Sequence, residues 1–259
     1  MSDEGGVQIR LATWNIGGGI LGESHQLQGK PQLDHYADVI GRFQPDILCV
    51  QEAHEYDTDQ VGQIEHLARA GGYEHTVSVP ISPSHMEENA SLTLGILSRF
   101  PISSHQYVKF PNPNLGAKGP HGDEWILFDK GYVRATPEIH GRTVGLVNAH
   151  CFPLQYFGAS PTEERFTGMW EDMAADLVGM SGDMPSLAAV DLNHTSIQEL
   201  LGSALGADGY SNSFEDTPTT PEGVQQDYLL YSQPFVLHQT RVVPTESDHS
   251  YCDVLVGLG

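Results

Sequence analysis

The sequence has few basic residues and no basic run. Its 259 residues include 12 Lys and Arg against 34 Asp and Glu, which makes the formal net charge −22. A protein that binds nucleic acid or anionic lipid chiefly by charge needs a basic patch that releases counterions from its partner. The composition therefore disfavours a broad basic nucleic-acid surface. Net charge otherwise bears on solubility and association, and not on the fold.

Cysteine and long apolar runs are also scarce. The three cysteines, Cys49, Cys151 and Cys252, are widely spaced and form no CxxC pair, so we expect free thiols in a reducing compartment. No apolar run approaches the ~18 residues of a membrane-spanning helix. Residues 1–6 are polar and acidic, unlike the basic start of a signal peptide. We therefore expect a cytoplasmic protein without a membrane span, acting as a monomer.

The hydrophobic periodicity predicts strands that alternate with helices. No linker, composition break or internal repeat interrupts this alternation, so we expect a single domain over residues 1–259. A capping box at Ser160–Glu163, with Pro161 inside it, marks a helix start, and Thr195 with Gln198 marks a second. Residues 111–124 are rich in Pro, Gly and Asn and predict a long loop. The predicted helices cover residues 31–43, 61–68, 161–179 and 195–205, and the predicted strands 7–14, 47–50, 75–79, 92–98, 102–109, 125–137, 143–150, 186–190, 227–232, 235–243 and 250–256.

Polar residues of the kind that bind ligands lie at the ends of six predicted strands. Loops at the ends of a sheet are where a rigid scaffold presents catalytic groups. Taken singly, each residue has a plainer explanation, since an Asn after a strand is usually a turn residue and Asp-x-Asn before a helix is usually a cap. Six such positions in one chain indicate a site. They are Asn15, Glu52, His150, Asp191 with Asn193, Asp227, and Asp248 with His249.

These residue types fit metal-assisted hydrolysis of a phosphoester. Glu52, Asn15 and Asp248 offer hard oxygen ligands, which suit Mg²⁺ or Mn²⁺ better than zinc. The sequence contains no HExxH and no paired cysteines, which a zinc site would favour. The remaining side chains can activate water and neutralise a phosphoryl oxygen, and the reaction requires both in addition to a Lewis acid.

In this order along the chain, the motifs resemble those of the endonuclease/exonuclease/phosphatase superfamily, which has the deoxyribonuclease I-like fold. The resemblance runs from Thr13 to His249. It implies a four-layer α/β/β/α sandwich of two mixed, mainly antiparallel sheets flanked by helices. It also implies Mg²⁺-dependent hydrolysis of phosphodiesters or phosphomonoesters. The motifs are TWN, QE, ILSRFPI, NAH, DLN, QDYLLYS and SDH.

The resemblance further implies a role for each motif residue. Glu52 would be the principal metal ligand, supported by Asn15 and Asp248. Asp191 would orient and deprotonate the attacking water, and Asn193 would hold a phosphate oxygen. His150 and His249 would donate to the phosphate, and Asp227 would orient His249. Two departures are visible: Val190 replaces the usual glycine of the DLN motif, and the Tyr-x-Pro-Asn pattern of the apurinic-site endonucleases is missing after His150. The second departure disfavours repair of abasic sites.

Two further residues are weaker candidates for substrate binding. Arg99, in ILSRFPI, could reach a phosphate, although a structural ion pair at the strand turn is the plainer interpretation. Trp125 could form an aromatic wall with Phe152, Tyr156, Phe157 and Trp170, although aromatic residues more often belong to a core.

Three functions remain open at this point. The first is a divalent-metal-dependent phosphoester hydrolase acting on a small phosphoester or a nucleic-acid end, because the acidic charge disfavours tracking along a long duplex. The second is a nonspecific endonuclease or exonuclease. The third is a binding protein of the same fold without catalysis, which would be expected to lack some of the site residues, whereas all eight are present.

Overall fold

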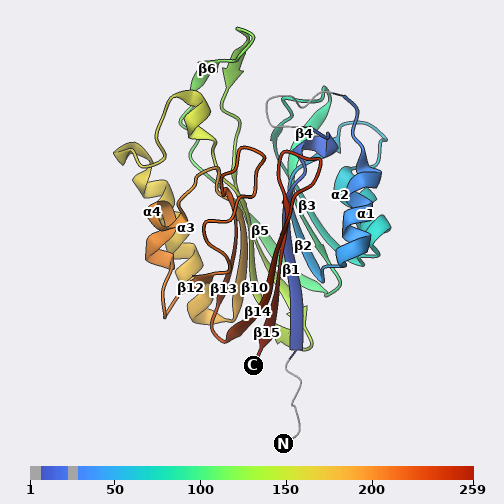
Figure 1. Ribbon diagram of the computed structural model, residues 1–259, viewed down its shortest axis with the longest axis vertical. Coiled ribbons are helices and arrows are strands. Elements are labelled where there is room, and N and C mark those ends of the chain that lie inside the picture. The colour runs from blue at the N-terminus through green and yellow to red at the C-terminus, as the bar shows by residue number, and fades with distance from the viewer. Residues whose placement is uncertain (1–6, 23–28) are drawn as a thin grey trace, which may run out of the picture.

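The computed structural model describes residues 7–22 and 29–259. Two large sheets lie face to face, and helices cover their two outer surfaces (Figure 1). In order of pairing, sheet A contains β14 (Phe235–Val243), β15 (Tyr251–Leu258), β1 (Val7–Asn15), β2 (Ile47–Tyr56), β4 (Ala90–Ser98) and β3 (His75–Pro83). Sheet B contains β12 (Tyr210–Asn212), β13 (Asp227–Ser232), β11 (Ser186–Asp191), β10 (Gly145–His150), β8 (Gly131–Ile139) and β5 (Ile102–Lys109), with β9 (Arg142–Thr143) paired to β8.

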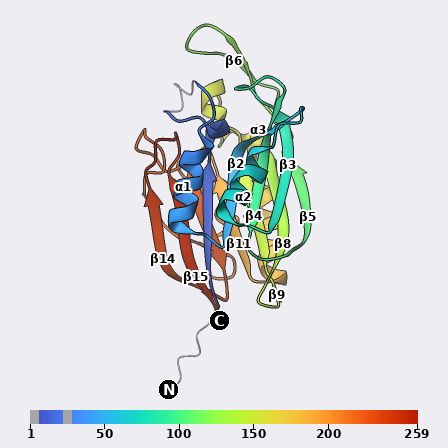
Figure 2. The same ribbon diagram turned by 90° about the vertical axis from the view of Figure 1, so that its right-hand side faces the viewer.

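The helices form the outer layers. Helices α1 (Leu33–Phe43) and α2 (Gln63–Gly71) lie on sheet A, and α3 (Glu164–Asp183) and α4 (Ile197–Leu201) lie on sheet B (Figures 1 and 2). Short 3-10 turns are η1 (Gly17–Gly19), η2 (Leu154–Phe157) and η3 (Gly202–Ala204). This arrangement confirms the predicted α/β/β/α sandwich. None of the described helices combines the length and apolar character needed to cross a membrane.

Three apolar layers separate the four structural layers. Between α1, α2 and sheet A pack residues such as Trp14 and Tyr36. Between the two sheets pack β-branched and aliphatic side chains such as Ile9 and Val254. Between sheet B and α3 packs a third cluster that includes Trp170. Because both sheets are covered on both faces, the sequences of their central strands are continuous apolar runs, without alternation of apolar and polar residues.

Several predicted boundaries were wrong. Helix α3 begins at Glu164, because residues 160–163 form a separate turn in which the Glu163 carboxylate accepts from the Ser160 N–H at 2.7 Å. Helix α4 is capped by Ser196, whose hydroxyl accepts from the Glu199 N–H, and not by Thr195. It is also shorter than the predicted 195–205, since the chain continues as η3.

The predicted loop over 111–124 contains a small hairpin. Strands β6 (Gly116–Lys118) and β7 (Glu124–Ile126) pair antiparallel and project beyond the ends of the two sheets (Figures 1 and 2). The predicted strand 125–137 is therefore divided between β7 and β8, with an extended segment between them. The hairpin extends over the edge of the sandwich at which the polar residues lie.

Candidate active site

The polar residues at the strand ends come together at one end of the sandwich. Strands β1 and β2 run parallel in sheet A, where Asn15 at the end of β1 is paired with Gln51 inside β2. Strands β10 and β11 run parallel in sheet B, where their last residues, His150 and Asp191, are paired. In sheet B, His150 is paired with Asp191, and Asp191 is paired with Asp227, the first residue of the antiparallel strand β13. The turn before β15 adds His249 from sheet A. The site is thus assembled across both sheets.

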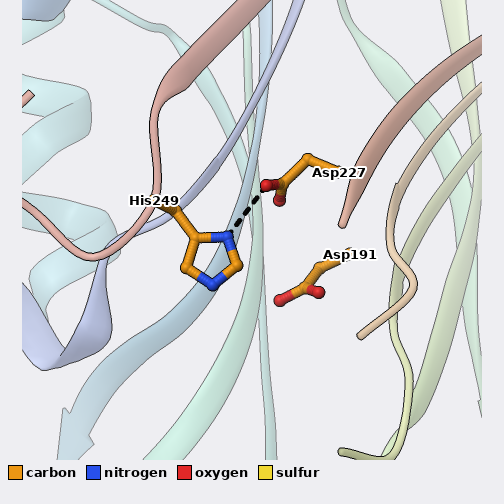
Figure 3. A group of neighbouring side chains, drawn as sticks. All are labelled: Asp191, Asp227 and His249. Atoms are coloured by element: carbon orange, nitrogen blue, oxygen red, sulfur yellow. Dashed lines mark hydrogen bonds and ion pairs between the residues drawn. The ribbon is translucent and has the colours of Figure 1, made fainter. Parts of the chain in front are cut away.

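Asp191, Asp227 and His249 form one compact cluster (Figure 3). One ligand-type atom from each lies within 4.8 Å of the others, and all three residues are buried. The Nδ1 of His249 is 2.8 Å from Oδ2 of Asp227. The other oxygen of Asp227, Oδ1, is buried without a hydrogen-bond partner among the described residues.

The pKa shifts within this cluster indicate which of its side chains carry a charge. Burial alone would lower the pKa of His249, but Asp227 and Asp191 outweigh that effect and raise the pKa well above the usual histidine value. Burial raises the pKa of Asp191 to about 7, although His249 opposes the shift. His249 is therefore a protonated donor and a poor metal ligand, whereas Asp191 changes its charge near neutral pH.

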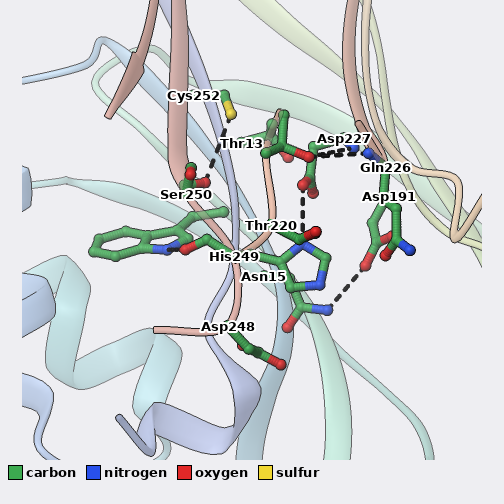
Figure 4. Close-up of polar contacts among 12 residues, drawn as sticks. Thr13, Asn15, Asp191, Thr220, Gln226, Asp227, Asp248, His249, Ser250 and Cys252 are labelled. Atoms are coloured by element: carbon green, nitrogen blue, oxygen red, sulfur yellow. Dashed lines mark hydrogen bonds and ion pairs between the residues drawn. The ribbon is translucent and has the colours of Figure 1, made fainter. Parts of the chain in front are cut away.

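Asn15, Glu52 and Asp248 lie beside this cluster (Figure 4 for Asn15 and Asp248). The Asn15 Nδ2 donates to Oδ2 of Asp191 at 2.9 Å, which joins the ends of β1 and β11 across the two sheets. Burial is the main cause that raises the pKa of Asp248 to about 6; His249 opposes this shift, and the charge of Glu52 adds to it. Two carboxylates that disfavour each other's charge are a setting in which a bound cation would be stabilised.

A backbone irregularity directs Glu52 into the site. Its φ is 55°, in the left-handed region, and the register of β2 against β4 shifts between Val50 and Ala53. Two residues of β2 thus oppose one residue of β4, which is a β-bulge, and bulges re-aim a side chain next to many active sites. A non-glycine residue in the left-handed region costs of order 1–3 kcal/mol and is concentrated at functional sites.

Lys130 is a site residue that the sequence analysis did not identify. It lies just before β8, is 4% exposed, and its Nζ is 3.3 Å from Oε1 of Glu52 and 3.0 Å from Nε2 of His150. Burial would raise the pKa of Glu52, but the charge of Lys130 holds it well below the usual value. Burial and Lys130 lower the pKa of His150 well below that of a free histidine. His150 is therefore neutral.

A buried amide pair beneath the site also went unrecognised. The Gln51 Nε2 donates to Oδ1 of Asn148 at 2.7 Å, and the Asn148 Nδ2 donates to the carbonyls of Val50 and Gly95 at 3.1 and 2.8 Å. Both side chains are fully buried between the sheets. Gln51 directly precedes Glu52, and Asn148 lies two residues before His150, so the pair ties together the two strands that carry these groups.

A pocket of about 680 Å³ opens above the cluster. Asn193 lines it, with its Nδ2 donating to the Cys151 carbonyl at 3.1 Å. Trp125 lines it from β7, together with Tyr156 and Phe157 of η2. Phe152 and Trp170, the other members of the predicted aromatic wall, are instead buried in the core between sheet B and α3. That part of the prediction was wrong.

The structure does not bring Arg99 to this group. Arg99 directly follows Ser98, which is paired with Ile47 at the start of β2, whereas Glu52 lies towards the other end. Its guanidinium lies 5.2 Å from the centre of the Tyr73 ring and contacts the Gly71 carbonyl at 3.4 Å. Arg99 thus anchors a turn at the far edge of sheet A.

Several solved structures have a fold similar to that of this chain. An endonuclease/exonuclease/phosphatase from Beutenbergia cavernae matches 97% of this chain and 72% of its own, with 19% identity and a TM-score of 0.75. The human Nocturnin catalytic domain, solved with bound sulfate, matches 97% and 94%, with 19% identity and a TM-score of 0.67. TDP2 from Caenorhabditis elegans matches 99% and 77%, with 17% identity and a TM-score of 0.61.

Sequence comparison assigns the family. No curated protein sequence matches the chain. The sequence pattern of the Endonuclease/Exonuclease/phosphatase family matches residues 12–249, which include every strand end of the site. Members of this family are generally hydrolases of phosphoester bonds. The chain therefore belongs to the endonuclease/exonuclease/phosphatase family.

Proposed function

We propose that this chain is a divalent-metal-dependent phosphoester hydrolase in which water attacks phosphorus directly, in line with the leaving group. The observation that carries the proposal is the buried cluster of Asp191, Asp227 and His249, of which His249 lines the pocket. It places an acid and a base of opposite charge within 4.8 Å of each other. Such a pair can take a proton from water and donate a hydrogen bond to a phosphoryl oxygen.

The chemistry of the donors fits a hard cation. Glu52, Asn15 and Asp248 would hold Mg²⁺ or Mn²⁺ through oxygen atoms. The bound ion would supply a Lewis acid that polarises the phosphoryl group. The raised pKa of His249 favours its protonated form, and a protonated imidazole nitrogen does not bind a metal ion. This supports the three oxygen ligands over the Asp–Asp–His group as the metal site.

The remaining residues would act on the substrate. Asp191, with a pKa raised to about 7, suits a base that works near neutral pH. His249 would donate through Nε2, since its Nδ1 is held by Asp227. Asn193, His150 and Lys130 would contact phosphate oxygens. We propose a small phosphoester or a nucleic-acid end as the substrate. We propose the cytoplasm as the location, because all three cysteines are free and buried.

A substrate panel tests this function. Purified protein is assayed with Mg²⁺ and with Mn²⁺ on oligonucleotides, nucleotides, sugar phosphates, lipids and p-nitrophenyl esters. We expect Asp191→Ala and His249→Ala each to lower kcat by about 100-fold or more. The exposed residues Asp208 and His238 supply matched controls, Asp208→Ala and His238→Ala, which should retain wild-type rates.

Three results would redirect the proposal. Activity of either site variant within threefold of wild type would refute the assigned roles. Fast internal cleavage of long oligonucleotides, with slow turnover of small esters, would support a nonspecific nuclease. No hydrolysis of any ester in the panel, together with no metal binding, would support a binding protein of the same fold.

A further inference from the structure

The pocket continues outward from the cluster onto aromatic side chains. Four of them, here called the aromatic wall, are Trp125, Phe128, Tyr156 and Phe157. Trp125 and Phe128 come from β7 and the segment after it, and Tyr156 and Phe157 come from η2. The wall and the catalytic residues Asn193 and His249 border the same cavity. A single substrate can therefore place one group against the wall and its phosphoryl group at the cluster.

The aromatic wall is held in place by its surroundings. The Trp125 Nε1 donates to Oδ2 of Asp123, and the indole packs so closely on Gly119 that a Cβ there would lie 2.4 Å from Nε1. The ring of Phe128 stacks on His85, with centroids 5.7 Å apart and an interplanar angle of 26°. Rigid aromatic faces bind rings at a low cost in conformational entropy.

Carboxylates border the outer pocket, and one of them, Glu124, is paired with Lys118 at 3.3 Å. Asp123, Glu124 and Glu222 border it there. Lys130 is the one Lys or Arg among the described residues that line the pocket, and it lies at the inner end beside Glu52 and His150. A polynucleotide requires cations along its backbone beyond the reacting phosphate. The outer pocket would instead repel a second phosphate.

We propose that the aromatic wall binds an aromatic ring carried by the phosphoester, and that the acidic residues beside it exclude substrates with further phosphate groups. The substrate class is then a phosphoester with one phosphoryl group joined to an uncharged ring system. This inference rests on the proposed function for the reaction, but the recognition of the ring can be measured separately by binding.

The test measures binding of ligands that resist hydrolysis, in the presence of Mg²⁺. The probes are phenylphosphonate, methylphosphonate and a single-stranded oligodeoxynucleotide with phosphorothioate linkages, titrated calorimetrically. We expect phenylphosphonate to bind wild type about tenfold or more tightly than methylphosphonate, since stacking on an aromatic side chain contributes about 1–3 kcal/mol. Trp125→Ala should reduce that ratio to about threefold or less, because it removes the largest ring of the wall.

A second variant tests the charge, and a third controls for folding. In Asp123→Asn/Glu124→Gln, the oligonucleotide should bind about threefold or more tightly than in wild type, with phenylphosphonate little changed. Val178, 43% exposed on α3, supplies Val178→Ala as the control, which should leave all three affinities unchanged. Circular dichroism checks that each variant keeps its secondary structure.

The outcomes separate this inference from the proposed function. Equal affinities for phenylphosphonate and methylphosphonate, or an unchanged ratio in Trp125→Ala, would overturn the inference, even in an active hydrolase. Tighter binding of the oligonucleotide than of phenylphosphonate to wild type would also overturn it and favour a nucleic acid. A phenyl preference that depends on Trp125, in a protein without hydrolytic activity, would support the ring site while the proposed function fails.

Discussion

The Asp191 carboxyl is completely buried, and two neighbours shift its pKa in opposite directions: His249 lowers it and Asp227 raises it. Burial raises the pKa of its carboxyl to about 7, well above the usual value of an aspartate. The charged form is therefore destabilised in the folded protein, even though the Asn15 amide and the Asn193 N–H both donate to it. A carboxylate in such surroundings destabilises the folded protein but would suit a base. Catalytic sites commonly show this trade-off between stability and activity.

We predict that Asp191→Asn stabilises the metal-free protein at alkaline pH. Because the folded pKa of Asp191 lies above its unfolded pKa, wild type loses stability as the pH rises from about 4 through about 7. The variant has no charge to bury, so it should be more stable than wild type by roughly 2–3 kcal/mol at pH 8 and nearly equal at pH 4.

Urea unfolding at pH 4, 6 and 8 in the presence of a chelator measures this difference. The exposed Asp208 provides the control variant Asp208→Asn, which should follow wild type at every pH. A variant that is less stable than wild type at pH 8 would contradict the assigned origin of the pKa shift.

At the residue scale, the sequence predicted which side chains belong to the site better than it predicted which residues contact them. Residues at strand ends, such as His150 and Asp227, could be identified because strand ends of one sheet share an edge. Lys130 could not, because a strand predicted over 125–137 placed it in the interior of an element. Arg99 also follows a strand, but its strand is antiparallel to β2, so it lies at the opposite edge. The direction of each strand in the sheet is not encoded in local periodicity.

At the element scale, the β-bulge of β2 and the amide pair Gln51–Asn148 act on the same strand. The bulge turns Glu52 toward the site, and the amide pair fixes β2 and β4 against β10 through the Val50 and Gly95 carbonyls. Buried polar networks of this kind are stabilising only when all members are satisfied. Removing one side chain leaves several buried groups without partners.

We predict that Asn148→Ala destabilises the protein by roughly 3 kcal/mol. The variant removes one acceptor of the Gln51 amide, which keeps its bond to Thr13, removes the side-chain donor to two carbonyls, and adds a small cavity between the sheets. Equilibrium urea unfolding measures the loss. Gln106→Ala, at an exposed position on β5, is the control and should change stability by less than about 0.5 kcal/mol. A loss below 1 kcal/mol for Asn148→Ala would contradict the role of the pair.

Long periodic elements could be predicted, and short irregular ones could not. Strands β5, β13 and β14 match their predicted ranges, since their strand-type residues are bounded by turn signals. The hairpin of β6 and β7 has three-residue strands in a segment rich in Gly and Pro, which is too short for periodicity to show. The outer pocket, including Trp125, depends on that hairpin, so its shape could not be predicted from the sequence.

At the scale of the whole molecule, the charge of −22 bears on stability. Like charges on a compact surface repel one another, and salt screens that repulsion over a Debye length of about 10 Å at 0.1 M. We predict that the melting temperature rises by a few degrees between about 20 and 500 mM NaCl. Differential scanning calorimetry with a chelator present measures the rise, and a fall over this range would contradict dominant surface repulsion.

The central claim is that oxygen ligands at this site hold a divalent ion required for phosphoester hydrolysis, and restoring metal to stripped protein tests it most directly. Wild type, Glu52→Gln and the control Glu171→Gln, altered at an exposed residue of α3, are treated with chelator and assayed on the best substrate of the panel while Mg²⁺ or Mn²⁺ is added back. We expect no activity without metal, full recovery in wild type and the control, and a rate at least about 100-fold lower in Glu52→Gln. Full activity in chelator, or recovery of Glu52→Gln to the wild-type rate at the same metal concentration, would contradict it.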